Sequence, residues 1–205
     1  MNISTSQTLL GLLLKGGWLM FPLALLSLLS LYILVERLLT YRRYLHFPSD
    51  FLAEIETHLS HGDVTQIQSI CAEQTNIIQK VISKGIAERH TAHAALILES
   101  ESGRVISFLE EKLSLLATIA GAAPMIGFLG TVTGMIQTFM AISQEKHHLS
   151  AQVFSSGIYE AMVTTVAGLV VGIIAYLGYN YCIAQVTKAT ARLNYLVNLF
   201  VAKVR

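Results

Sequence analysis

Charged and apolar positions are sharply separated along this chain of 205 residues. Three stretches contain no Asp, Glu, Lys, Arg or His: 16–35, 113–144 and 161–187. Each is longer than the roughly 18 uncharged apolar residues that mark a helix able to cross a membrane. The pattern therefore predicts an all-α integral membrane protein. We expect its three transmembrane helices at 16–39, 113–143 and 158–183.

The polar segment at 40–112, between the first two spans, is also expected to be helical. Asp50 is placed to cap one helix, and further helices are expected at 64–72 and 76–90. From Thr91 onward, apolar residues recur at helical spacing up to the second span. We therefore expect the second span to be the end of one long helix that starts outside the membrane. Helices of this length favour a bundle shared between subunits.

The composition supports a membrane protein, with 53% hydrophobic residues, 13% charged residues and a mean hydropathy of +0.57. Soluble domains carry roughly a quarter charged residues, which argues against a soluble enzyme. Cys71 and Cys182 are too few for a disulfide framework and are expected to be free thiols.

Basic residues near the span ends predict the orientation, because they concentrate on the inner side of a membrane. Arg37, Arg42 and Arg43 follow the first span, whereas the flank at 1–15 and the loop at 144–157 have one Lys each. The N-terminus and that loop are therefore expected outside, and the segment at 40–112 inside. A C-terminal helix at 184–205 is also expected inside. Residues 1–15 are predicted to form an amphipathic segment in the membrane interface.

The second span is rich in small residues and hydroxyls. Gly130 and Gly134 form a G-xxx-G pair that permits close helix packing. Pro124 is expected either to kink the helix or to free carbonyls that neighbouring groups must satisfy. Gly127 and Thr131 fall on the same face as Pro124 and Gly134. This face is either a packing seam with Thr131 as a hydrogen-bonding group, or part of a polar path.

The third span has the same character, with a second G-xxx-G pair at Gly168 and Gly172. Thr165 is expected at a depth similar to that of Thr131, so the two hydroxyls could line one path. Glu160 stands at the outer end of this span. An acid in a span is a functional candidate by default, although an ordinary solvated or paired carboxylate is the alternative.

No ionisable residue lies at mid-membrane in any predicted span. Threonine hydroxyls form hydrogen bonds but do not store a proton at neutral pH. If this chain conducts protons, the titrating carboxylate must therefore come from another polypeptide.

Other chemistry finds little support. The histidine pairs have no Cys or carboxylate partner at a ligand spacing, so no metal site is predicted; they are His58 and His61, His90 and His93, and His147 and His148. No basic stripe suggests nucleic-acid binding, and no nucleotide or other cofactor motif is present.

Two segments, 123–135 and 157–169, followed by Tyr179 and Asn180, resemble the MotA/TolQ/ExbB proton channel family. The resemblance extends over most of the chain, and the three-span layout is similar to that of ExbB- and TolQ-type members. Phe128, Met162, Thr133 and Val171 depart from the expected pattern at positions that leave the assignment intact.

The resemblance implies a homopentameric ring in the bacterial inner membrane, with a periplasmic N-terminus, a cytoplasmic C-terminus and long helices extending into the cytoplasm. The ring would surround a dimeric ExbD- or TolR-like partner, whose single span carries the titrating Asp. Thr131 and Thr165 match pore-lining threonines, and Glu160 matches a family glutamate. The ring would pass the protonmotive force to a TonB- or TolA-like protein.

Three functions follow as hypotheses. The first is an ExbB-like subunit that energises outer-membrane import, or a TolQ-like subunit that maintains the envelope. The second is a non-conducting membrane scaffold. The third, an intramembrane enzyme, lacks a nucleophile–base pair or a metal site at mid-depth.

Overall fold

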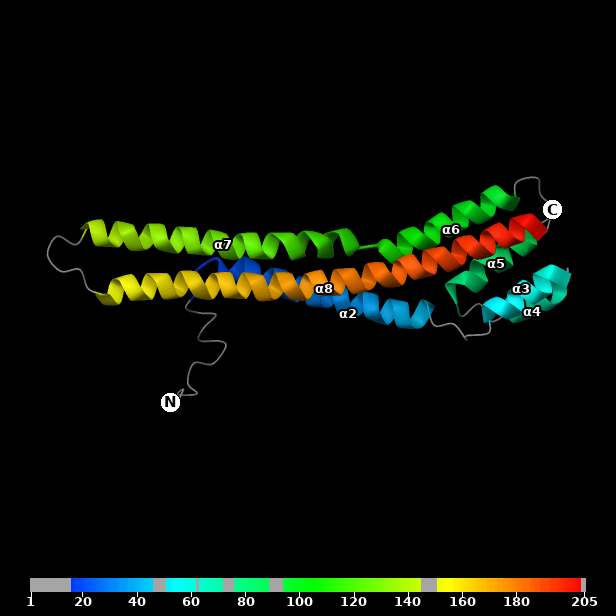
Figure 1. The fold of residues 1–205 in the computed structure, drawn as a ribbon, viewed down its shortest axis with the longest axis horizontal. Helices are drawn as coiled ribbons and strands as arrows, with labels where there is room; N and C mark the ends of the chain where they lie inside the picture. The colour runs from blue at the N-terminus through cyan, green and yellow to red at the C-terminus, as the bar shows by residue number, and fades with distance from the viewer. Residues whose placement is uncertain are drawn as a thin grey trace, which may run out of the picture. The chain divides into compact units, whose positions relative to one another are not determined.

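The computed structural model describes residues 16–45, 51–61, 63–71, 76–88, 94–144 and 151–203, and all regular structure in these ranges is α-helix (Figure 1). The helices are α2 (Met20–Tyr44), α3 (Phe51–His61), α4 (Val64–Cys71), α5 (Ile77–Ala87), α6 (Ala94–Glu110), α7 (Leu113–Gln144) and α8 (Ala151–Lys203). Three helical stretches are long and apolar enough to cross a membrane: 20–44, 94–143 and 157–202. The all-α class with three candidate spans is thereby confirmed.

Some predictions fall outside the described residues. They are the amphipathic segment at 1–15, the cap at Asp50, and four of the histidines (His90, His93, His147 and His148). The exact membrane boundaries of the three spans also stay predictions.

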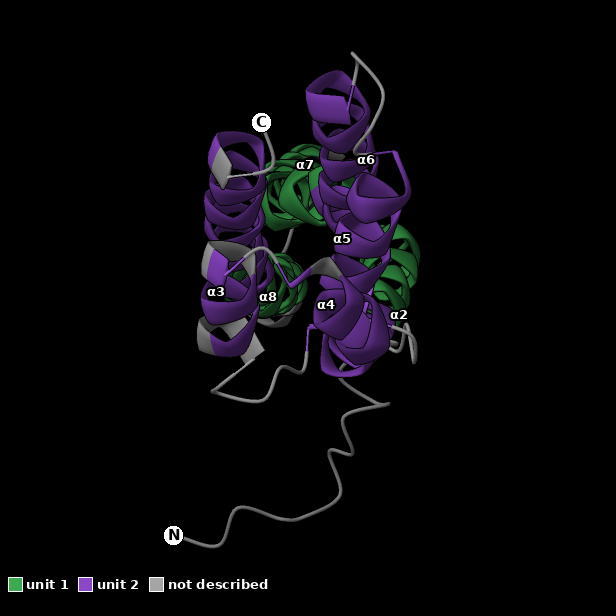
Figure 2. Ribbon diagram, turned by 90° about the vertical axis from the view of Figure 1, so that its right-hand side faces the viewer, with its two compact units in different colours: residues 1–34, 114–179 green, residues 35–113, 180–205 purple. Residues whose placement is uncertain are grey.

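The chain divides into two compact units (Figure 2). Unit 1 comprises residues 1–34 and 114–179, and unit 2 comprises residues 35–113 and 180–205. Helices α2 and α8 each contribute residues to both units.

Unit 1 has small apolar cores between long helices. One core is formed by Ile33, Leu116, Ile119 and Ala175, and another by Met20, Leu23 and Ala123. Many large apolar side chains remain exposed, among them Phe21 of α2, Phe128 of α7 and Leu177 of α8. Helices that are apolar on all sides are typical of membrane spans.

Unit 2 packs α3, α4, α5, α6 and the end of α8 around large aliphatic side chains. Its fully buried members include Ile55, Ile67, Ile78, Ile86, Leu98 and Leu193. Helix α5 begins with a capping box. The Asn76 side chain accepts a hydrogen bond from the Ile78 N–H at 3.1 Å, and the Gln79 side chain accepts one from the Asn76 N–H at 3.0 Å.

The long helix predicted to start near Thr91 and to end in the second span is interrupted by a short turn within the helical stretch 94–143. Helix α6 ends at Glu110 and α7 begins at Leu113, with Lys112 in the left-handed region at φ 62°. The physical cause lies in side chains of α2 that contact the end of α6. Helix α8 shows the opposite departure, because it is a single helix of 53 residues that begins at Ala151, within the loop predicted at 144–157.

Candidate functional site

In unit 1, helices α7 and α8 lie side by side in direct backbone contact (Figure 1). A Cβ atom placed on Gly168 would lie 2.6 Å from the Ala123 carbonyl oxygen and 2.8 Å from the Gly127 Cα. One placed on Gly127 would lie 3.1 Å from the Gly168 Cα. Any side chain at Gly168 would therefore push the two helices apart, as expected for glycine-mediated packing in membranes.

This contact, which we call the glycine seam, continues in both directions along the helices. Gly172 lies against the Pro124 ring, where a Cβ would be 2.5 Å from the proline Cγ. Gly130 lies against the Thr164 side chain, and Gly134 against Ala161. Proline lacks an N–H, so the Ala120 carbonyl has no donor four residues later. Gly172 approaches that carbonyl instead, with its placed Cβ 3.1 Å from the oxygen.

The two predicted lining threonines use their hydroxyls differently. Thr165 donates a hydrogen bond across the seam to the Gly127 carbonyl at 2.9 Å. Thr131, one turn after Gly127, donates to the Phe128 carbonyl of its own helix at 2.7 Å, on an exposed surface. Each hydroxyl oxygen can still accept a hydrogen bond. Thr165 of α8 therefore lies against the turn of α7 that precedes Thr131. The role of the two threonines in lining a proton path stays a prediction.

Glu160 lies beside the segment that precedes α2. A side chain at Gly17, which has a left-handed φ of 71°, would collide with the Glu160 Oε1. One turn after Glu160, the buried Thr164 hydroxyl donates to the Gly16 carbonyl at 2.8 Å. A small pocket in unit 1 is lined by Glu160, Thr164, Thr133, Gln137, Gly130, Gly134 and residues 16–19.

Thr164 is the polar residue of this site that the sequence did not single out. Its neighbour Thr165 carried the family resemblance, and the resemblance does not show which of the two adjacent hydroxyls faces the residues before the first span. The helical offset of four residues from Glu160 was the one available signal.

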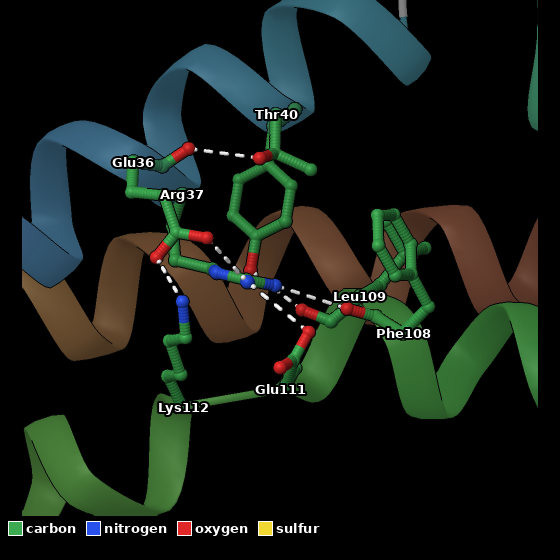
Figure 3. Close-up of polar contacts among 8 residues, drawn as sticks. Glu36, Arg37, Thr40, Phe108, Leu109, Glu111 and Lys112 are labelled. Carbon is green, nitrogen blue, oxygen red and sulfur yellow. Dashed lines mark hydrogen bonds and ion pairs between the residues drawn. The ribbon is translucent and has the colours of Figure 1, made fainter.

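Unit 2 contains a cluster of charges at the junction of α6 and α7 (Figure 3). Arg37, only 1% exposed, donates to the Phe108 carbonyl at 2.9 Å and to the Glu36 carboxylate at 2.9 Å. Its guanidinium also lies 3.4 Å from Glu111. The Lys112 ammonium donates to Glu36 at 2.7 Å, which closes the cluster.

This cluster explains the break between α6 and α7. In a continuous helix, the carbonyls of Phe108 and Leu109 would accept hydrogen bonds from the residues four positions later. Here the Phe108 carbonyl accepts from Arg37, and the Leu109 carbonyl accepts from the Tyr41 hydroxyl at 2.9 Å. Side chains of α2 therefore provide the capping that ends α6.

Among the described residues, no three His, Cys, Asp or Glu side chains are grouped so that they could hold a metal ion. Cys71 and Cys182 are both free and buried. Burial raises the pKa of the Cys71 thiol to about 11, so this thiol is not a reactive thiolate at neutral pH.

These features define a polytopic helical membrane protein. Its apolar helices are long enough to cross a membrane, and a glycine seam with hydroxyls joins two of them. Most of its charged residues lie in unit 2. Residues 73–194 match the model of the MotA/TolQ/ExbB proton channel family, and the chain belongs to this family. The matched range includes the whole glycine seam, and it confirms the family predicted from the sequence.

Individual relatives agree. A putative biopolymer transport protein ExbB-like 1 from Synechocystis is 31% identical over 187 residues, which cover 89% of this chain and 73% of the relative. The Tol-Pal system protein TolQ of Haemophilus influenzae is 42% identical over 77 residues, covering 38% of this chain and 33% of that protein. A biopolymer transport protein ExbB from Aquifex aeolicus is 36% identical over 78 residues, covering 38% of this chain and 52% of that protein.

Proposed function

We propose that this chain is the channel-forming subunit of an inner-membrane energising complex. With an ExbD- or TolR-like partner it would convert the protonmotive force into work on a TonB- or TolA-like protein, and so drive import across the outer membrane. The observation that carries the proposal is the glycine seam. The Thr165 hydroxyl donates across it, and the Thr131 hydroxyl and the Glu160 carboxylate lie on the same two helices, in stretches with no ionisable residue at mid-depth.

The missing acid supports a requirement for a partner. Protons need a titrating group in the membrane, and hydroxyls supply only hydrogen bonds. The Thr131 hydroxyl lies on an exposed part of the protomer, where a partner helix that carries an Asp can approach. A homopentameric ring of this chain would enclose such helices.

The orientation in the proposal rests on charge. Unit 2 holds the basic residues that follow the first and third spans, including Arg37, Arg42, Lys188 and Arg192. The positive-inside rule assigns such residues to the cytoplasm. The N-terminus would then be periplasmic, and the C-terminus and the helices of unit 2 would be cytoplasmic.

The TolQ-like role is the second candidate, favoured by the 42% identity to a TolQ over the shorter match. The ExbB-like role is preferred because a relative matched over 89% of this chain is ExbB-like. A non-conducting scaffold would use the same glycine seam for packing alone.

Proton flux into liposomes distinguishes conduction from a scaffold. The chain, reconstituted with an ExbD-like partner, is expected to give flux that falls strongly when Thr131→Val and Thr165→Val are combined. Thr187→Val serves as the matched control. Like Thr131, Thr187 donates its hydroxyl to a carbonyl of its own helix, here that of Ile183, but it lies beyond the predicted third span. Full flux in the double variant would contradict the lining role, and the absence of flux with any partner would favour the scaffold.

A further inference from the structure

The turn before the first span packs directly onto the acid at the end of the third span. Gly17 has φ 71°, a conformation that side-chain-bearing residues rarely adopt. Its Cα faces the Glu160 carboxylate so closely that an added Cβ would overlap the Oε1 atom. The positive φ therefore favours glycine at this position, and any side chain there would require the Glu160 carboxylate to move away from the turn.

A hydrogen bond ties the same turn to α8. The Thr164 hydroxyl, 1% exposed as a residue, donates to the Gly16 carbonyl at 2.8 Å. The hydroxyl also lies 3.0 Å from the carbonyl of Glu160, in the preceding turn of α8. Thr164 thus connects the backbone of the turn to the helix that carries the acid.

The space at Gly16 is restricted as well. A Cβ there would lie 2.5 Å from the Met20 Cγ and 3.3 Å from the Thr164 hydroxyl oxygen. A larger residue at Gly16 would therefore require the Met20 side chain to move. The turn forms one wall of the pocket that Glu160 shares with Thr133 and Gln137 of α7.

We propose that the Gly16–Gly17 turn is the positioning element for the Glu160 carboxylate, with Thr164 as the residue that holds the turn in place. The turn lies directly against the carboxylate and forms one wall of the pocket that the carboxylate shares with α7. The contact sets the position of the Glu160 carboxylate. Its importance for proton conduction rests on the function proposed above.

A double-mutant cycle tests the contact without any measurement of conduction. Gly17→Ala is made in the wild-type chain and in the Glu160→Asp chain, and the unfolding equilibrium is measured in detergent. Shortening the acid by one methylene removes the overlap but not the backbone strain at residue 17. We expect Gly17→Ala to be less destabilising in the Glu160→Asp chain by about tenfold in the unfolding equilibrium constant, as for residues in contact. Equal effects in both chains would overturn the proposal.

Infrared difference spectroscopy reports changes in the hydrogen bonding and surroundings of the carboxylate. The band of Glu160 is assigned by subtracting the spectrum of Glu160→Gln, in the full chain in lipid nanodiscs. We expect Gly17→Ala and Thr164→Val to shift this band, whereas Thr164→Ser, which keeps the hydroxyl, leaves it in place. Gly121→Ala is the control, because a Cβ there meets no atom within 4 Å. An unshifted band in Gly17→Ala would overturn the positioning role.

Proton flux with the partner then connects the contact to conduction. Gly17→Ala is expected to reduce flux about tenfold or more, since a misplacement of about 1 Å can have effects of this size at a reacting group. Full flux in a variant with a shifted band would overturn the functional importance of the turn. Absence of flux in the wild type would overturn the proposed function instead, and the cycle and the infrared band would still decide the contact.

Discussion

The glycine seam of unit 1 and the aliphatic core of unit 2 use opposite means to hold helices together. In the seam, Gly127 and Gly168 bring two backbones into contact, and Thr165 donates a hydrogen bond directly to a carbonyl of the neighbouring helix. In unit 2, large side chains such as Ile78 and Leu193 fill the space between helices.

The difference is the one expected if unit 1 lies in the bilayer and unit 2 in water, as proposed above. In a bilayer, burial of apolar side chains between helices gains little, so packing relies on close contact and hydrogen bonds. In water, the same burial is the main stabilising contribution. A substitution that adds volume should therefore damage the seam most, and one that removes volume should damage unit 2 most.

The largest effect is expected for Gly168→Val. Its side chain would enter the space occupied by the Ala123 carbonyl and the Gly127 Cα, which are backbone atoms that cannot rotate away. We expect the free energy of unfolding in detergent to fall by about 3 kcal/mol or more, the upper range for overpacking. Gly121→Val is the control, since that site is open. Equal stability of the two variants would show that the helices do not touch as described.

The converse change in unit 2 is Ile78→Ala. This side chain is 1% exposed, and its truncation leaves a cavity in a core of other aliphatic residues. A loss of about 2–5 kcal/mol in the free energy of unfolding is expected. Leu96→Ala, at a position 64% exposed, should have a small effect by comparison. A negligible effect of Ile78→Ala would mean that unit 2 is not held by its core.

Most of the features that distinguish the two units can be predicted from the sequence, but the break between α6 and α7 cannot. The spans, the helix near Asn76 and the G-xxx-G pairs are all visible as local periodicity and spacing. The break at Lys112 is not, because its cause is Arg37, more than seventy residues earlier. In the sequence, Arg37 is recognisable only as a basic residue that follows the first span. Its hydrogen bond to the Phe108 carbonyl is a tertiary contact.

The candidate site likewise has residues that the sequence reveals and contacts that it does not. Glu160, Thr165 and the seam glycines are recognisable because they lie in spans otherwise free of charge. The contact of Glu160 with Gly17 joins two segments far apart in the chain and depends on the positive φ of Gly17. Helical periodicity carries no information on such a turn, and the same holds for the pairing of Thr164 with Gly16.

An intermediate effect is expected for Arg37→Met at the junction. Methionine keeps the apolar length of the side chain but leaves the Phe108 carbonyl without its donor. The cost of one buried unsatisfied group predicts a loss of about 1–3 kcal/mol in unfolding free energy. Hydrogen exchange should rise at the end of α6 and stay unchanged in the seam. Arg42→Met, an exposed position on the same helix, should change neither; exchange unaltered in Arg37→Met would contradict the capping role.

The smallest effect at neutral pH concerns Cys71 in unit 2. Its pKa is raised by burial from about 9 to about 11, so folding disfavours the thiolate. Between these values the unfolded chain loses the proton first, and stability should therefore fall as the pH rises from about 9 to about 11. The comparison is the slope of unfolding free energy against pH in wild type and Cys71→Ala. Identical slopes would show that the thiol is accessible to water.

The central claim is that this chain supplies a path for protons but not the group that titrates on it. The most direct measurement is proton flux into liposomes that contain this chain alone, with its ExbD- or TolR-like partner, or with a partner whose membrane Asp is replaced by Asn. The account predicts flux only with the intact partner. Equal flux from the chain alone would contradict it.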